Sequence, residues 1–229
     1  MILAIETSTK VCSVALGNKQ GIKDFKASYE ENSHSKYLTV FIEELLKNNG
    51  ITVDDLDAIA VSEGPGSYTG LRIGVSAAKG LAYAKDKPMI AVDTLLTMVL
   101  EVLNNHNNLI DSETLLIPMI DARRMEVYHA VFDAKGNKLT QTTNLIVDQN
   151  SFSQQLDKGK VVFFGDGAAK CKDVIKHENA IFIDNINPLA TNMIKPACEK
   201  LQNKDFVDVA YFEPFYLKPF VAVKSNKKL

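Results

Sequence analysis

Apolar and polar positions are arranged over the first thirty residues in the way that β-strands require. Residues 2–6 (ILAIE) form a buried-strand pattern, residues 12–18 (CSVALGN) can return as an antiparallel partner, and residues 21–28 (GIKDFKAS) can extend the sheet. The pattern predicts a three-stranded meander at the start of the chain.

A helical repeat of apolar residues follows the meander. We expect a helix over residues 34–49, with Ser33 as its N-cap and Gly50 as its C-terminal stop. Its apolar surface is wider than the stripe that a single core contact needs, and it consists of Tyr37, Leu38, Phe41, Ile42, Leu45 and Leu46. The excess predicts that one edge of this helix has a second partner.

Strands and helices then alternate, and the order repeats in the second half of the chain. The first half continues with strands near residues 57–64 and 88–92 and helices near 68–85 and 94–104. The second half predicts strands near 115–121, 126–137, 139–147, 160–166 and 180–184, and helices near 150–157, 167–177 and 188–203.

Both halves open with a buried strand that ends in a carboxylate, Glu6 in one and Asp121 in the other. We therefore expect an α/β fold of two related lobes, residues 1–105 and 106–229, each a mixed sheet flanked by helices. The segment 211–220 (YFEPFYLKPF) contains two prolines, which make it a poor central strand. Its aromatic residues predict a strap that packs across the lobes.

The stretch SEGPGSYTGLRIG, residues 62–74, holds four glycines. Its spacing fits neither the dinucleotide fingerprint nor the Walker loop, although a strand-to-helix turn can still offer amides to an anion. Gly66, Gly70, Gly74 and Ala78 recur every four residues, and each glycine inside a helix costs about 1 kcal/mol relative to alanine. Close approach by another element would compensate, either within the same lobe or from a second chain.

Composition narrows the classes of function. The 229 residues are 46% hydrophobic with a formal net charge of −2, so no overall field attracts nucleic acid or an anionic membrane. We find no secretory signal, no apolar run of membrane-spanning length and no paired cysteine spacing. These features predict a cytoplasmic protein that does not bind membranes.

Candidate catalytic residues are sparse. The four histidines, His34, His106, His129 and His177, are scattered, and no serine lies in a nucleophile-elbow motif. The segment DARRMEVY gathers Asp121, Arg123 and Arg124 at a turn that opens the second lobe. These groups either compensate one another or recognise a phosphate or carboxylate at the cleft.

Several motifs together resemble the TsaB (YeaZ) family, bacterial proteins needed for threonylcarbamoyladenosine in tRNA. They are ILAIETSTKVCSVAL, HSKYLTVFIEELL, SEGPGSYTGLRIGVSAAKGLAYA, PMIAVDTLLTM, IDARRMEVYHAVF and EPFYLK, in the family's order and spacing. The resemblance runs from residue 2 to about 218 and is stronger before residue 130. It implies two actin-like, ribonuclease H-like lobes.

The resemblance also implies a role as a non-catalytic scaffold. TsaB-like proteins bind the catalytic paralogue TsaD, the ATPase TsaE joins them, and the complex modifies adenosine 37 of tRNAs that read codons beginning with A. The two first-lobe helices would contact TsaD, or a second copy of the chain when TsaD is absent, and tRNA would be contacted only through the complex. The expected contact residues are Leu38, Phe41, Ile42, Leu45, Gly70, Leu71, Gly74, Val75, Ala78 and Leu81.

The same resemblance bears on cofactors and catalysis. TsaD-like chains carry a metal-binding histidine pair where this chain has Thr94 and Met98, which cannot replace it. We expect no tightly bound cofactor, with ATP or ADP at the interface of the complex and a residual nucleotide site at Glu6, Asp121 and Arg123. An actin-like ATPase or a peptidase acting on its own are the alternatives.

Overall fold

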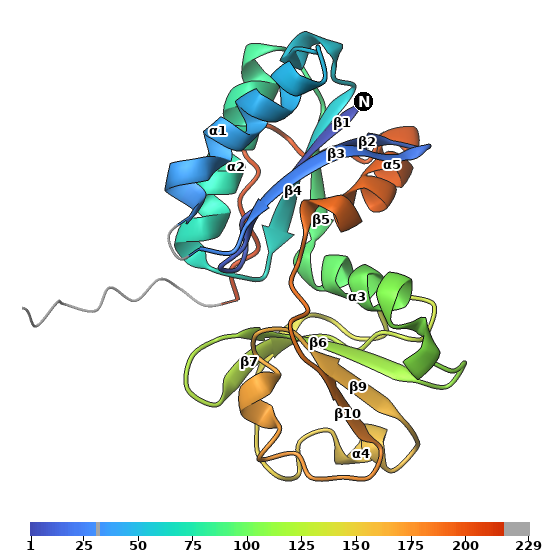
Figure 1. Ribbon diagram of the computed structural model, residues 1–229. Coiled ribbons are helices and arrows are strands. Elements are labelled where there is room, and N and C mark those ends of the chain that lie inside the picture. Colours follow the sequence, from blue (N-terminus) through green and yellow to red (C-terminus); the bar gives the residue numbers. More distant parts are fainter. Residues whose placement is uncertain (31–32, 218–229) are drawn as a thin grey trace, which may run out of the picture.

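The computed structural model describes residues 1–30 and 33–217, which form two lobes, each built on one five-stranded mixed sheet (Figure 1). The first sheet has the order β3-β2-β1-β4-β5, and the second has the order β10-β9-β6-β7-β8. The first five strands are β1 (Ile2–Glu6), β2 (Cys12–Asn18), β3 (Gly21–Ser28), β4 (Ala58–Gly64) and β5 (Met89–Asp93). The second five are β6 (Leu115–Asp121), β7 (Glu126–His129), β8 (Thr143–Ile146), β9 (Val161–Phe164) and β10 (Ala180–Ile183). The expected fold class is confirmed.

The predicted meander is present, because β1, β2 and β3 pair antiparallel in sequence order. Side chains of β1 alternate between the two faces of the sheet, as the period of a strand requires. Leu3 and Ile5 enter the core beneath the first two helices, whereas Ile2 and Ala4 pack on the opposite face. Both faces of this sheet are therefore buried at β1.

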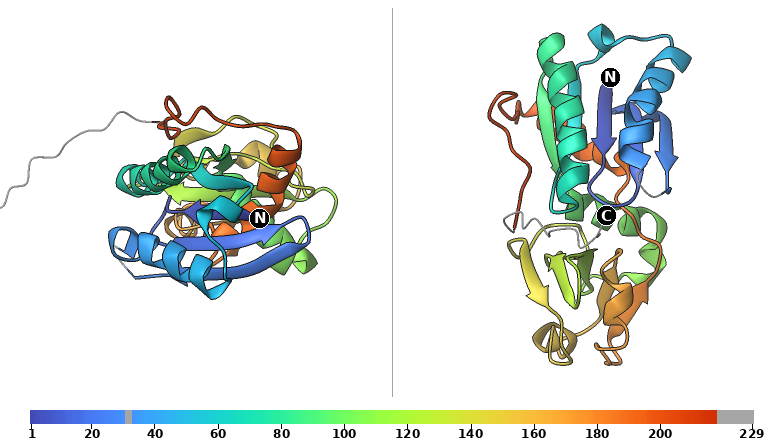
Figure 2. Two further views of the ribbon diagram at one scale, coloured as in Figure 1. Left: turned by 90° about the horizontal axis from the view of Figure 1, so that it is seen from above. Right: turned by 90° about the vertical axis from the view of Figure 1, so that its left-hand side faces the viewer.

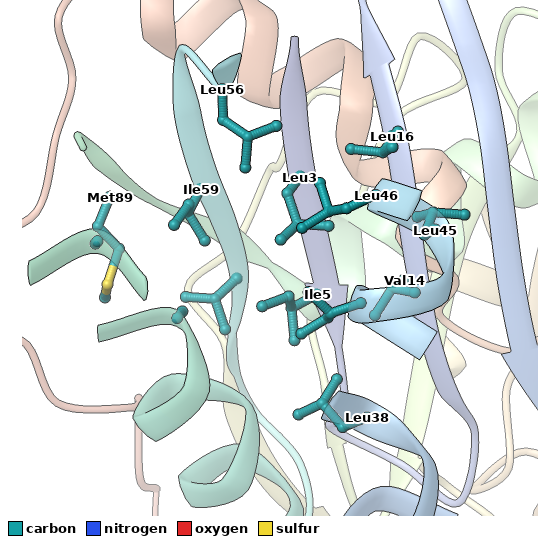
Figure 3. Close-up of a cluster of buried hydrophobic side chains, with 14 of the residues drawn as sticks. Leu3, Ile5, Val14, Leu16, Leu38, Leu45, Leu46, Leu56, Ile59 and Met89 are labelled. Carbon is teal, nitrogen blue, oxygen red and sulfur yellow. The ribbon is translucent and has the colours of Figure 1, made fainter. Parts of the chain in front are cut away.

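Helices α1 (Ser33–Asn48) and α2 (Tyr68–Ala84) lie side by side on one face of the first sheet (Figures 1 and 2). Figure 3 shows Leu38 and Leu45 of α1 among the side chains of β1 and β2. Ser33 is the first residue of α1, and its hydroxyl donates to the carbonyl of Lys10 at 3.4 Å. The predicted cap is thus replaced by a contact that ties the helix to the β1–β2 turn. Gly50 follows the helix with a φ of 64°, as predicted for a stop.

The second lobe contains less helix than the sequence pattern predicts. Helix α4 spans only Ser153–Leu156, and the helix expected over residues 167–177 is reduced to a single 3₁₀ turn at Ala169–Cys171. Gly165 and Gly167 hold this segment against the sheet: a Cβ on Gly167 would lie 2.9 Å from the carbonyl carbon of Ile120. The backbone is too close to β6 for a full helix to form there.

Two helices are exchanged across the boundary expected after residue 105. Helix α3 (Thr94–Asn105) packs Leu95 and Met98 against the second sheet. Helix α5 (Ile194–Gln202) and the preceding 3₁₀ turn pack Met193 and Ala197 on the first sheet. Each half of the chain therefore contributes one helix to the core of the other lobe.

The last described segment runs along the edge of the first lobe (Figure 2). The amide of Val207 donates to the carbonyl of Met89 at 2.9 Å, and the amide of Phe215 donates to Glu63 at 2.7 Å. Of the strap predicted over residues 211–220, the structure describes residues 211–217: Tyr216 packs on Tyr68 of α2 with ring centroids 4.9 Å apart, and residues 215–217 border the space between the lobes. Residues 218–220 lie outside the described chain. Within the described residues, no helix is both long and apolar enough to cross a membrane.

Candidate functional site

A cavity of about 870 Å³ lies between the lobes. On the first lobe it is lined by the β1–β2 turn, residues 8–10, by the start of α1 and by residues 65–70, which lead into α2. On the second lobe it is lined by the turn between β6 and β7, which includes Asp121, Arg123 and Arg124. The cavity thus brings together the glycine-rich stretch and the arginine turn, which are far apart in the sequence.

The glycines of the first lobe serve the approach of α2 to the β1–β2 turn. A Cβ on Gly66 would lie 2.3 Å from the carbonyl oxygen of Ser8, and a Cβ on Gly70 would lie 2.2 Å from that of Thr7. The hydroxyl of Thr7 donates to the carbonyl of Gly70 at 2.8 Å, and the amide of Ser67 donates to Ser8 at 2.6 Å. These glycines therefore pack inside their own lobe, which is the first of the two alternatives.

Gly80 differs from those glycines. A Cβ on Gly80 would meet no atom within 4 Å, and the residue is exposed on α2. It leaves the helix surface open at this point.

The β1–β2 turn carries buried polar groups without hydrogen-bond partners among the described residues. They are the second carboxylate oxygen of Glu6, the hydroxyls of Ser8 and Thr9, and Nε2 of His34 at the start of α1. Thr9 is only 7% exposed, and it lines the cavity together with Ser8 and His34. A buried polar atom without a partner is costly, so such a cluster next to a cavity marks a candidate ligand site.

Glu6 is fully buried and does not line the cavity, although it was expected in a nucleotide site. Burial raises its pKa, while the Ser8 amide, which donates to Oε1 at 2.6 Å, acts in the opposite direction. Magnesium needs ionised, accessible carboxylates, and a buried carboxyl with a raised pKa does not supply one. Glu6 is therefore a structural residue of the turn.

Asp121, the other expected carboxylate, does line the cavity but is already engaged. It pairs with Lys170, and its Oδ1 accepts the amide of Arg123 at 3.0 Å. Its own amide donates to Asp166 at 2.9 Å. The carboxylates of the cleft thus hold the second-lobe turn together, and the predicted nucleotide set of Glu6, Asp121 and Arg123 does not form a magnesium site.

Arg123 and Arg124 occupy an unusual backbone conformation. Their φ values are 70° and 52°, which place both residues in the left-handed region, where asparagine and glycine are favoured. A left-handed conformation costs roughly 1–3 kcal/mol for such residues. Both side chains are exposed at the cavity, and neither has an ion-pair partner within the described part of the chain. Sequence reasoning found the pair but not the strained turn that presents it.

The expected contact residues on α1 and α2 are largely internal. Two of the ten, Phe41 and Leu81, are half-buried and reach the surface. The chain itself buries the other eight, namely Leu38, Ile42, Leu45, Gly70, Leu71, Gly74, Val75 and Ala78. Residues buried in their own lobe cannot form the surface that a second subunit touches. The periodicity of apolar residues identifies the stripe of each helix that faces the sheet.

Other residues of the same helices remain open. Val40 is 42% exposed and Tyr83 is 85% exposed. Half-buried apolar residues accompany them on both helices: Tyr37 and Phe41 on α1, and Ile73, Ala77 and Leu81 on α2. A partly apolar surface is therefore present on α1 and α2; it includes Phe41 and Leu81 of the predicted set and otherwise consists of residues that were not predicted.

Thr94 and Met98 are both fully buried at the start of α3. Met98 belongs to the core of the second lobe, and its methyl group lies against Gly165. Among residues 1–30 and 33–217, no group of three or more histidine, cysteine, aspartate or glutamate side chains is placed to hold a metal ion. The positions that correspond to the metal-binding pair are used for packing.

Comparison with known proteins agrees with this architecture. The family model of TsaD, tRNA N6-adenosine threonylcarbamoyltransferase, matches residues 26–229. The chain is 32% identical to the tRNA threonylcarbamoyladenosine biosynthesis protein TsaB of Escherichia coli, covering 98% of this chain and 97% of that one. It is 30% identical to TsaB of Haemophilus influenzae, covering 98% and 96%.

A solved structure, YeaZ from Pseudomonas aeruginosa, superposes with a TM-score of 0.76 at 25% identity, covering 94% of this chain and 99% of that one. Sequence and fold therefore agree over nearly the whole length of both chains. The chain belongs to the TsaB (YeaZ) family.

Proposed function

We propose that this protein takes part in the formation of threonylcarbamoyladenosine in tRNA as a non-catalytic partner of a TsaD-type transferase. The packing of Thr94 and Met98 carries this proposal. Where the transferases hold their histidine pair, this chain buries a hydroxyl and a thioether in the core, at 0% exposure each. A metal-dependent transfer reaction has no ligand set at this position.

The open surface of α1 and α2 is the proposed contact with the transferase. It combines the half-buried apolar residues Phe41 and Leu81 with the small residues Ala77 and Gly80, which allow a partner helix to approach closely. A stable contact of this kind buries on the order of 1,600 Å² in total. In the absence of the transferase, two copies of the chain can cover the same face in a symmetric dimer.

The direct test is reconstitution of tRNA threonylcarbamoylation from purified TsaD and TsaE of the same organism, supplied with ATP, unmodified tRNA and threonylcarbamoyl adenylate as the donor, with and without this chain. We expect modification of adenosine 37 to depend on the chain, and the chain alone to transfer nothing. Equal rates without it would contradict the proposal. Appreciable ATP hydrolysis or cleavage of TsaD by the purified chain alone would favour the enzyme alternatives instead.

A further inference from the structure

The second-lobe wall of the cavity presents positive charge. Arg123 and Arg124 line the cavity, are exposed, and have no ion-pair partner within residues 1–30 and 33–217. Their left-handed backbone is the conformation that asparagine and glycine adopt with less strain. Two arginines in these positions are explained by what their side chains do in the cleft.

The first-lobe wall holds hydrogen-bond groups beside the same cavity. The Thr9 hydroxyl is buried without a partner among the described residues, and Thr9 lines the cavity. The start of α2, a helix of 17 residues, lines it as well through residues 67–70. The first amides of a helix and its dipole favour a negatively charged group.

The acidic groups of the cavity are already engaged, so they do not define its ligand. Asp121 pairs with Lys170, and Asp166 accepts the amide of Asp121. Glu126 accepts the side-chain amide of Asn144 at 2.5 Å. The other polar groups along the cavity include the two guanidinium forks, the hydroxyls of Ser8 and Thr9, and the N-terminus of α2, all of which can donate hydrogen bonds to oxygen.

We propose that the interlobe cavity binds a small, multiply charged oxyanion, held between the Arg123–Arg124 turn and the wall formed by Thr9 and the start of α2. Guanidinium forks match both phosphate and carboxylate groups, so the ligand is a phosphorylated or polycarboxylated small molecule. The cavity volume of about 870 Å³ lies within the range of small-molecule sites. This inference does not depend on the proposed role beside a transferase.

The test measures binding of pyrophosphate and of citrate to the full chain by calorimetry, at low and moderate salt. The two probes separate phosphate from carboxylate recognition. Three variants define the site: R123Q/R124Q removes both charges, R123N/R124G removes the charges and also relaxes the turn, and T9V removes the hydroxyl without changing the shape. The control K158Q/K204Q removes two exposed charges that do not line the cavity.

We expect the unmodified chain to bind at least one probe, with an affinity that falls as salt increases. Both arginine variants should bind the probe about tenfold or more weakly, as is typical when charge-assisted hydrogen bonds are removed. T9V should also bind more weakly. R123N/R124G should melt at the same temperature as the unmodified chain or higher, which separates lost binding from lost folding. The control should bind like the unmodified chain.

Three results would overturn the inference. The first is that the unmodified chain binds neither probe at millimolar concentration. The second is that R123Q/R124Q binds as tightly as K158Q/K204Q. The third is that T9V keeps full affinity, because the first-lobe wall would then take no part in the site.

Discussion

The hydroxyl of Thr7 occupies the space in which a side chain on Gly74 would begin. A Cβ at Gly74 would lie 2.2 Å from Thr7 Oγ1 but 3.4 Å from Thr7 Cβ. The first distance is impossible for real atoms, whereas the second is an ordinary contact. Glycine is therefore required at position 74 because Thr7 Oγ1, in the turn that follows β1, occupies the space of a Cβ. A general need for a small residue does not explain it.

Changing Gly74 to alanine should destabilise the protein by about 1–3 kcal/mol, the usual cost of overpacking, despite alanine's better helix propensity. Thr7→Ala should cost about 1 kcal/mol, because it removes the hydrogen bond to Gly70. In the double variant the clash disappears, so the loss should be smaller than the sum of the two single losses. Urea unfolding of all four proteins measures this coupling, and simple additivity would contradict the contact.

Gly80→Arg should leave the fold intact and weaken the contact with the transferase. A side chain at Gly80 meets no atom within 4 Å, so the substitution adds bulk and charge only to the open surface of α2. We expect an unchanged or higher melting temperature, because arginine favours a helix more than glycine does, and at least about a tenfold loss of affinity for TsaD. Gly159→Arg is the matched control, because a Cβ there also meets no atom within 4 Å. If both variants bind TsaD alike, the contact lies elsewhere.

His129 should make the protein less stable in mild acid. Burial lowers the pKa of this histidine from 6.5 to about 4, and its ring packs edge-on against Phe152. Between these two values the unfolded chain binds a proton that the folded chain does not, so stability is lost as pH falls from 6.5 towards 4. The full shift corresponds to roughly 3 kcal/mol at 1.36 kcal/mol per pKa unit.

The substitution H129L should reduce the dependence of stability on pH. The free energy of unfolding is measured at several pH values between 4 and 7.5. Its slope against pH is the test, because a loss of packing lowers the free energy by the same amount at every pH. An unchanged slope would show that other groups cause the loss of stability in acid.

Glu6→Gln should stabilise the protein at neutral pH. Burial raises the pKa of Glu6 above its ordinary 4.5, so the folded chain keeps a proton that the unfolded chain releases as pH rises above that value. The contribution of the Glu6 carboxyl to stability is fully present below pH 4.5. It is lost as pH rises through the pKa of Glu6 in the folded protein. Glutamine retains the Oε1 that accepts the Ser8 amide and carries no charge. The gain in stability from Glu6→Gln should therefore be greater at pH 7 than at pH 4. A gain that stays constant with pH would contradict the ionisation argument.

The first lobe follows its local sequence closely. Strands β1, β2 and β3 coincide with the predicted ranges, and α2 ends within one residue of its predicted limit. These elements have unbroken apolar patterns and clear boundary residues, such as Ser67, which caps α2 by accepting the amide of Gly70 at 3.2 Å. Local pattern and tertiary environment agree there.

The second lobe and the contact surface depend on features that periodicity does not record. Residues 167–177 have helical spacing, but Gly165 and Gly167 bring their backbone against β6 and leave only a 3₁₀ turn. On α1 and α2 the strongest apolar positions face the sheet, so periodicity identifies Leu38 and Ile42 before the surface residues beside them. The Arg123–Arg124 turn lacks the asparagine or glycine that would have signalled it.

Gly66, Gly70 and Gly74 seat α2 directly on residues 7 and 8, and Ser33 ties α1 to the neighbouring Lys10. Residues 7–10 thus support both helices, and residues 8–10 also line the cleft. The space between the lobes and the outer helices therefore share one structural element, so a substitution that alters the seating of α2 on Ser8 would reshape the wall of the cavity as well.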